Sequence, residues 1–142
     1  MAYSCEKYKV PALTIEEMET LIDGLKLYRY NSLSIGAAMG IRAAFRALSE
    51  LGADRNNREI ELATVNSGYC FAQAVEFICA VPHLRGRMNF TPSDDYDNTT
   101  LEAKTKEKQV FIHMNNLPFA SIEEVLSADD NALFQAVTVT EI

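Results

Sequence analysis

The chain has 142 residues, 48% of them apolar, and a formal net charge of −7 from 13 Lys and Arg against 20 Asp and Glu. This length predicts one domain, residues 1–142, whose core forms without disulfide or metal staples, and the acidic balance argues against nucleic-acid partners. No apolar run is long enough for a signal peptide or a membrane span, and the widely spaced Cys5, Cys70 and Cys79 fit reduced thiols, so we expect a cytoplasmic protein without membrane contacts.

Two long helices are predicted in the first part of the chain. Thr14 and Glu17 have the spacing of a capping box, which predicts that a helix begins there. A second helix is expected from about Ser34 to Leu51, because its apolar residues recur at helical spacing and Gly52 is a natural stop.

A strand and a third helix are predicted next. Residues 60–65 alternate between apolar and polar types, which is typical of a strand. Residues 66–68, Asn-Ser-Gly, predict a turn. The helix expected from about Cys70 to Ala80 is ended by Pro82. It is apolar almost all round and is therefore expected to be deeply buried.

The second half of the chain is predicted to be mostly strands. In chain order we expect a polar loop at 91–98, a strand pair at 100–105 and 109–114, a turn at 115–118, helix starts at Ser121 and Asp129, and a last strand at 136–142. Helices and strands do not alternate as regular βαβ units, which favours an α+β fold with an antiparallel or mixed sheet packed against several helices.

The stretch from Tyr30 to Ala44 resembles a known family. It reads Y-N-S-L-S-I-G-A-A-M-G-I-R-A-A, and the FmdE-like family, named for a component of formylmethanofuran dehydrogenase, opens with H-G-H-x-C-P-G, small residues and G-Y-R-A-A. The positions that match are Gly36, Ala38, Gly40, Arg42, Ala43 and Ala44. Weaker similarity extends over nearly the whole chain, with Cys70 at a family cysteine, Gly86 at a family glycine, and a similar tail at 126–142. The resemblance implies the family's fold.

The departures from the family motif concern its metal ligands. Tyr30, Ser32 and Ser34 stand where the family has His, His and Cys, and of the four ligands that the family implies only Cys70 is retained. Hydroxyl and phenol groups bind zinc or iron poorly compared with imidazole and thiolate. The resemblance therefore implies a metal-free site, and we expect no metal and no cofactor.

The resemblance also predicts a pocket between two helix starts. Tyr30, Ser32 and Ser34 are expected at the start of the second helix, facing a pair from the third, Cys70 and Gln73. Backbone N–H groups at the two helix starts favour an anionic or carbonyl-bearing ligand. A basic cluster follows the third helix, and we expect its members to reach the rim of the pocket: His83, Arg85 and Arg87.

Simpler interpretations of the same residues stay open. Ser32 or Ser34 is also a good N-cap for the second helix, and Cys70 is also typical of a small buried residue. The basic cluster at 83–87 is equally consistent with a solvated loop or with ion pairs to the excess acids. Cys79, inside the buried helix, is expected in the core.

Three functions remain as hypotheses. The first is a metal-free member of the family that binds a small organic ligand or a partner protein. The second is an enzyme in which Cys70, Tyr30 or His83 acts as acid, base or nucleophile, although no motif assigns a catalytic residue. The third is a structural component of a larger complex.

A homodimer is expected from a glycine face on the second helix. Gly36 and Gly40 lie one turn apart, and glycine inside a helix costs about 1 kcal/mol, so two of them indicate close approach of another backbone or a ligand. Members of the family also look dimeric. The alternative is that the glycine face packs inside the monomer.

Overall fold

The computed structural model describes residues 7–116 and 121–142, so Cys5 and part of the turn expected at 115–118 lie outside the described residues. Within the described residues the elements are, in chain order, α1 (Ile15–Tyr28), α2 (Ile35–Leu51), β1 (Leu62–Ser67), α3 (Tyr69–Cys79), β2 (Met88–Pro92), β3 (Thr100–Lys104), β4 (Lys108–Met114), α4 (Ile122–Ser127), α5 (Asp130–Leu133) and β5 (Phe134–Glu141). The strands form one sheet in the order β2-β1-β3-β4-β5.

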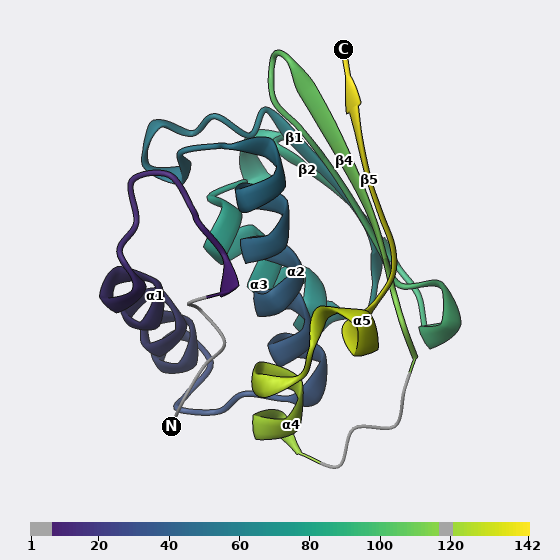
Figure 1. The fold of residues 1–142 in the computed structure, drawn as a ribbon. Helices are drawn as coiled ribbons and strands as arrows, with labels where there is room; N and C mark the ends of the chain where they lie inside the picture. The colour runs from purple at the N-terminus through teal and green to yellow at the C-terminus, as the bar shows by residue number, and fades with distance from the viewer. Residues whose placement is uncertain (1–6, 117–120) are drawn as a thin grey trace.

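The molecule is layered, with the sheet at one side and the helices at the other (Figure 1). Helices α2 and α3 pack against the sheet, and α1 lies beyond them, on their side away from the strands. Strands β1 and β2 are parallel, whereas the other neighbouring strands are antiparallel. This mixed sheet packed against helices confirms the expected α+β class.

The predicted ends of the long helices are confirmed. The Thr14 hydroxyl accepts a hydrogen bond from the Glu17 amide at 3.1 Å, and the Thr14 amide donates to the Glu17 carboxylate at 3.1 Å. The Ser34 hydroxyl accepts from the Ala37 amide at 3.1 Å, which starts α2. Helix α2 ends at Gly52, whose φ of 60° lies in the left-handed region that glycine adopts without strain.

The elements around α3 differ in part from the prediction. The strand expected at 60–65 is present, but it runs two residues later, from Leu62 to Ser67 (β1). The turn expected at 66–68 was wrong, because these residues are the end of β1 and Gly68, the N-cap of α3. Strand β2 was missed altogether. Only its first residue, Met88, is buried, because β2 is an edge strand, and it therefore lacks the alternation that identifies a strand. As a result β1, α3 and β2 form a βαβ unit that the sequence did not indicate.

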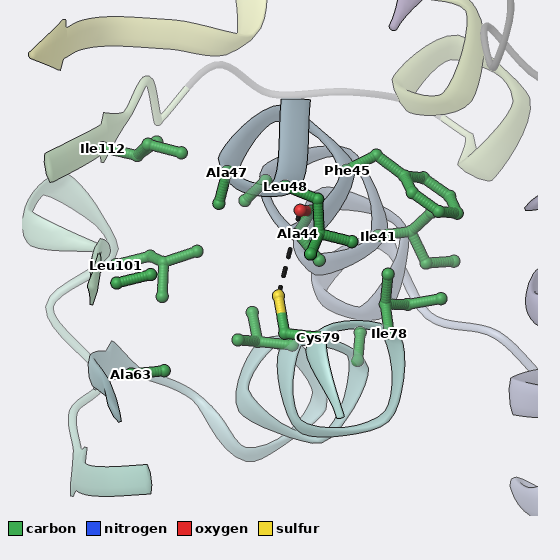
Figure 2. Packing of buried hydrophobic residues seen from close by; sticks show 14 of the residues in the cluster. Ile41, Ala44, Phe45, Ala47, Leu48, Ala63, Ile78, Cys79, Leu101 and Ile112 are labelled. Atoms are coloured by element: carbon green, nitrogen blue, oxygen red, sulfur yellow. Dashed lines mark hydrogen bonds between the residues drawn. The ribbon is translucent and has the colours of Figure 1, made fainter. Parts of the chain in front are cut away.

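The core extends to both sides of the α2/α3 pair (Figure 2). Figure 2 shows Ala47 and Cys79 on the side of the helices that faces the strand residues Ala63, Leu101 and Ile112. On the other side of the pair, away from the strands, lie Ile41, Phe45 and Ile78. Cys79 is fully buried, as expected, and its thiol donates to the Ala44 carbonyl at 3.8 Å. Burial raises the pKa of Cys79 to about 12, so this thiol stays neutral.

The glycine face of α2 packs against α3 of the same chain. A Cβ at Gly40 would lie 2.5 Å from the Phe71 carbonyl oxygen and 2.8 Å from the Ala74 Cβ, whereas a Cβ at Gly36 would lie 3.4 Å from the Cys70 Cβ. Close contact within one chain therefore explains Gly40, whereas a side chain at Gly36 would be near ordinary contact distance of α3. The homodimer expected from this face loses that support.

A buried arginine cluster, here called the Arg42 cluster (Tyr8, Arg42, Arg46 and Asp130), joins the N-terminal segment to α2 and α5. Arg42 is 2% exposed, and its guanidinium donates to the Asp130 carboxylate at 2.7 Å and to the Tyr8 hydroxyl at 3.2 and 3.1 Å. Two carbonyls, those of Val125 and Ala128, accept from it at 2.9 and 2.8 Å. Arg46 also pairs with Asp130.

Candidate functional site

Two helix starts meet at one place in the structure. Helix α2 begins after Ser34 and α3 begins after Gly68. The position of Gly36, in the first turn of α2, lies in van der Waals distance of Cys70, in the first turn of α3. Because Gly68 has no side chain, α3 has no side-chain cap, and the positive end of its dipole faces this junction.

Arg29, at the C-cap of α1, holds this junction together. Its guanidinium donates to the Gln73 side-chain oxygen at 2.5 Å, to the Cys70 sulfur at 3.3 Å and, with long geometry, to the Ser34 hydroxyl at 3.5 Å. Its Nε donates to the Ser32 carbonyl at 3.2 Å. Three elements therefore converge on one cationic side chain, and Arg29, Ser34, Cys70 and Gln73 are called the Arg29 cluster below.

The Arg29 cluster favours the thiolate form of Cys70. The Ser34 hydroxyl accepts from the α2 backbone, so its own hydrogen is left to donate to the sulfur, and this hydrogen bond is the largest cause that lowers the pKa of Cys70. Partial burial opposes this, and the hydrogen bond and charge of Arg29 lower the pKa further. The position of Cys70 at the start of α3 acts in the same direction.

Arg29 has no acidic partner in the part of the chain that the structure describes. None of its hydrogen-bond acceptors there is a carboxylate, and it takes part in none of the ion pairs, although the chain contains 20 Asp and Glu. Each of its acceptors is a carbonyl, a hydroxyl, an amide or a thiol. Together with the uncapped start of α3, this gives a positive field at the cluster as long as Cys70 is a neutral thiol. One carboxylate, that of Glu76, lines the same hollow, and it accepts a hydrogen bond from the His83 amide at 2.8 Å.

Two hollows share Tyr69 and Cys70 in their linings. The Arg29 hollow has a volume of about 560 Å³, and its lining includes Tyr28, Arg29, Tyr69, Cys70, Gln73 and His83. The Tyr96 hollow has a volume of about 490 Å³, and its lining includes Ser34, Gly36, Met39, Tyr69, Cys70 and Tyr96. Both volumes lie in the range of small-molecule sites.

Some of the residues proposed from the sequence come together here. Ser34, Cys70 and Gln73 belong to the Arg29 cluster, as the resemblance implied, and His83 lines the Arg29 hollow. The His83 Nδ1 lies 3.0 Å from the Met88 carbonyl. Because that oxygen only accepts, Nδ1 carries the hydrogen in the neutral ring and Nε2 is left as a base.

Other proposed residues lie elsewhere. The Tyr30 side chain is 95% exposed and lines neither hollow. Ser32 is exposed and contributes only its carbonyl. Arg85 is exposed and lines neither hollow, and Arg87 instead donates to the carbonyls of Arg58 and Ile60.

Two residues of the site were missed from the sequence, Arg29 and Tyr69. Arg29 ends the first helix in the sequence Y-R-Y, and nothing in that pattern distinguishes it from a solvated arginine. Tyr69 precedes the predicted start of the third helix by one residue, and its side chain is 71% exposed. The available signal in the sequence was a tyrosine directly before the predicted start of an otherwise apolar helix.

The described residues contain no group of three or more His, Cys, Asp or Glu side chains arranged to hold a metal ion. No helix in 7–116 or 121–142 is long and apolar enough to cross a membrane. Comparisons with protein-family models and with curated proteins find no match to this chain.

Proposed function

We propose that this protein binds a small organic anion in the Arg29 hollow. The observation that carries the proposal is that Arg29, in an acidic chain, has no carboxylate partner among the described residues and points at the uncapped start of a helix. A carboxylate or phosphate of a ligand would supply the missing negative charge. Tyr28, Tyr69 and Phe90 line the same hollow and suit an apolar or aromatic ligand body.

We also propose that the chain is a divergent member of the FmdE-like family. Support comes from the alignment, which sets Ser34 and Cys70 at two ligand positions of that family, and from the contacts by which Arg29 links these two side chains. Their meeting does not follow from local sequence patterns, because they lie on different helices.

The residues at this position do not fit the metal that the family implies. The Arg29 guanidinium lies 3.3 Å from the Cys70 sulfur, and a second cation beside the same sulfur would be repelled. Ser34 supplies a neutral hydroxyl, which is a poor ligand for zinc or iron. Tyr30 stands at a further ligand position of the family, but its side chain is exposed and lies away from the cluster.

Calorimetric titration tests the binding of anions directly. Benzoate and phenyl phosphate are suitable probes, because each joins a negative group to an aromatic body, and benzyl alcohol is the neutral control. We expect saturable binding of at least one anion, and a loss of about tenfold or more in affinity for Arg29→Gln, which corresponds to about 1.4 kcal/mol.

The matched control is Arg85→Gln. It removes the same charge from an exposed arginine that lines neither hollow, so it is expected to leave the affinity unchanged. Equal losses in the two variants would indicate unspecific attraction by net charge and would contradict the proposal, as would anion binding that survives Arg29→Gln.

A thiol enzyme is the second candidate. It is favoured by the lowered pKa of Cys70 and by the presence of His83, with a free Nε2, in the same hollow. In this function Cys70 is the nucleophile and His83 the acid and base. Incubation with activated aromatic esters followed by mass spectrometry tests this function. We expect an acyl adduct on Cys70 that is then hydrolysed, and a slower hydrolysis of the adduct in His83→Gln. The absence of any adduct would contradict this function.

A further inference from the structure

Strand β5 is an open edge of the sheet. It lies last in the strand order, pairs only with β4 among the described strands, and six of its eight residues are exposed. Its sequence, F-Q-A-V-T-V-T-E, is rich in β-branched residues and contains one charge and no proline. The opposite edge, β2, is shorter and ends in Pro92. Open edges of this kind are normally protected by charge, proline or a covering segment, because they pair with other strands.

The backbone groups that point away from β4 are identified by one hydrogen bond. The Ile142 amide donates to the Glu107 carbonyl at 2.8 Å, next to the register pair Lys108↔Glu141. In an antiparallel pair, the N–H and C=O of a residue point together, and successive residues alternate between the two edges. The even residues of β5 therefore bond to β4, and Val137, Val139 and Glu141 present their backbone groups outward. Within the described chain, no other segment forms a hydrogen bond with these outward backbone groups.

An antiparallel pairing of β5 with β5 of a second copy uses these outward groups. A two-fold axis at Thr138 sets Val137 opposite Val139 of the other copy, and Val139 opposite Val137. Both are hydrogen-bonded pairs, which together form about four inter-chain hydrogen bonds. The overlap then spans 135–141 in both copies, whereas an axis at Val139 overlaps only 137–141. An axis at Val137 overlaps as many residues, but it sets Val139 opposite Gln135, at the register irregularity of β5, instead of opposite a valine.

Side chains match in the same register. Val137 and Val139 lie on the helix side of the sheet, opposite Ile112 and Val110 of β4. Val139 is nevertheless 39% exposed, and its pairing with a valine of the second copy covers it. On the other face Thr138 meets its own copy. Glu141, on the same face as the two valines, lies opposite Gln135 instead of another acid. Moving the axis to Val139 would set Val137 against Glu141.

We infer that the protein forms a two-fold homodimer through β5, with the axis at Thr138, which joins the two sheets into one continuous sheet. The inference is independent of the proposed anion site and of the glycine face of α2, which is already occupied by α3. The partner is a second copy because the strand is complementary to itself in charge and in residue type.

Light scattering during size exclusion tests the association. At micromolar concentration we expect twice the chain mass of 15.9 kDa. Val139→Pro removes an amide hydrogen that points away from β4, so it spares the internal sheet and is expected to yield a monomer with unchanged circular dichroism. A wild-type monomer would overturn the inference, and so would a Val139→Pro dimer.

Cysteine cross-linking tests the register, in a background with Cys5→Ser and Cys70→Ser. Thr138→Cys places two thiols face to face at a pair without backbone hydrogen bonds, where Cα atoms approach to about 4.5 Å, and a disulfide forms readily. Thr140→Cys, on the same face, is the matched control. We expect a covalent dimer of Thr138→Cys and none of Thr140→Cys alone, but a covalent dimer when Thr140→Cys is mixed with Ala136→Cys. Failure of Thr138→Cys to cross-link, or cross-linking of Thr140→Cys alone, would overturn the proposed axis.

Discussion

The two arginine clusters of this protein use the same side chain in opposite ways. In the Arg42 cluster the guanidinium is buried, all of its donor nitrogens are hydrogen-bonded, and Asp130 neutralises its charge. In the Arg29 cluster the guanidinium has no carboxylate acceptor among the described residues and opens on a hollow. The first arrangement satisfies the charge inside the fold, whereas the second leaves charge available to a ligand.

The two clusters also differ in their effect on nearby acids. Burial, together with the hydrogen bond to Asp130, raises the pKa of Tyr8 in the Arg42 cluster, so that its hydroxyl stays protonated. In the Arg29 cluster the pKa of Cys70 is lowered. A neutral phenol is a structural hydrogen-bond partner, whereas a lowered thiol pKa suits a nucleophile, and this difference supports the proposal that places the ligand site at the Arg29 cluster.

The largest expected effect is on stability, from Arg42→Met compared with Arg29→Met. Arg42→Met leaves the carbonyls of Val125 and Ala128 without their buried donor and removes one of the two arginines that pair with Asp130, and we expect the free energy of unfolding to fall by about 3–5 kcal/mol. Arg29→Met removes hydrogen bonds to neutral groups that water is able to replace, and we expect a loss of less than about 1 kcal/mol. Urea denaturation of both variants measures the difference.

Similar losses in the two arginine variants would contradict the division into a structural and a functional cluster. If Arg29→Met proves as destabilising as Arg42→Met, the unpaired charge of Arg29 is needed to hold α1 against α3, and the case for a ligand weakens.

The next effect concerns the helix contact on which the Arg29 cluster depends. Gly40→Ala would set a methyl group 2.5 Å from the Phe71 carbonyl, and we expect a loss of about 1–3 kcal/mol as α3 is displaced. Gly36→Ala, where the methyl group would lie 3.4 Å from Cys70, is the matched control and is expected to stay within about 1 kcal/mol of wild type. Thermal unfolding compares them, and a tolerated Gly40→Ala would show that α2 and α3 are less closely packed than these contacts require.

The smallest effect is a pH dependence of stability. The pKa of Cys70 is lower in the folded chain than the ordinary thiol value of 9.0, so the unfolded chain binds more protons between these two values, and folding gains stability as the pH rises. The wild type is therefore expected to gain stability relative to Cys70→Ser from the folded pKa upward, levelling off near the ordinary thiol pKa of 9.0. Cys79 has a raised pKa and the opposite trend, but it is present in both proteins and cancels.

Denaturation of the wild type and Cys70→Ser at several pH values gives this difference. A difference that does not change with pH would mean that the folded chain does not stabilise the thiolate. Repeating the pair in an Arg29→Met background is expected to reduce the slope, because Arg29 is one of its causes.

The site was partly predictable. The capping serine at Ser34 and the cysteine at Cys70 are visible in the sequence, and the family resemblance implied that they meet. Arg29 was not found, because its role depends on the direction in which the chain leaves α1. It also depends on two hydrogen-bond acceptors, Cys70 and Gln73, that lie more than 40 residues away in the sequence. Arg85 looked equally suitable in the sequence and lies outside both hollows.

The sequence by itself determined the local elements whose signals lie within a few residues. The capping box at Thr14, the glycine stop at Gly52 and the alternation of β3 and β4 all depend on neighbours in the chain, and the structure has each of them. Only the tertiary structure decided how the two arginine clusters differ and why β2 is a strand. Both depend on long-range partners, since Asp130 neutralises Arg42 from 88 positions away, and β2 is held in place by its pairing with β1.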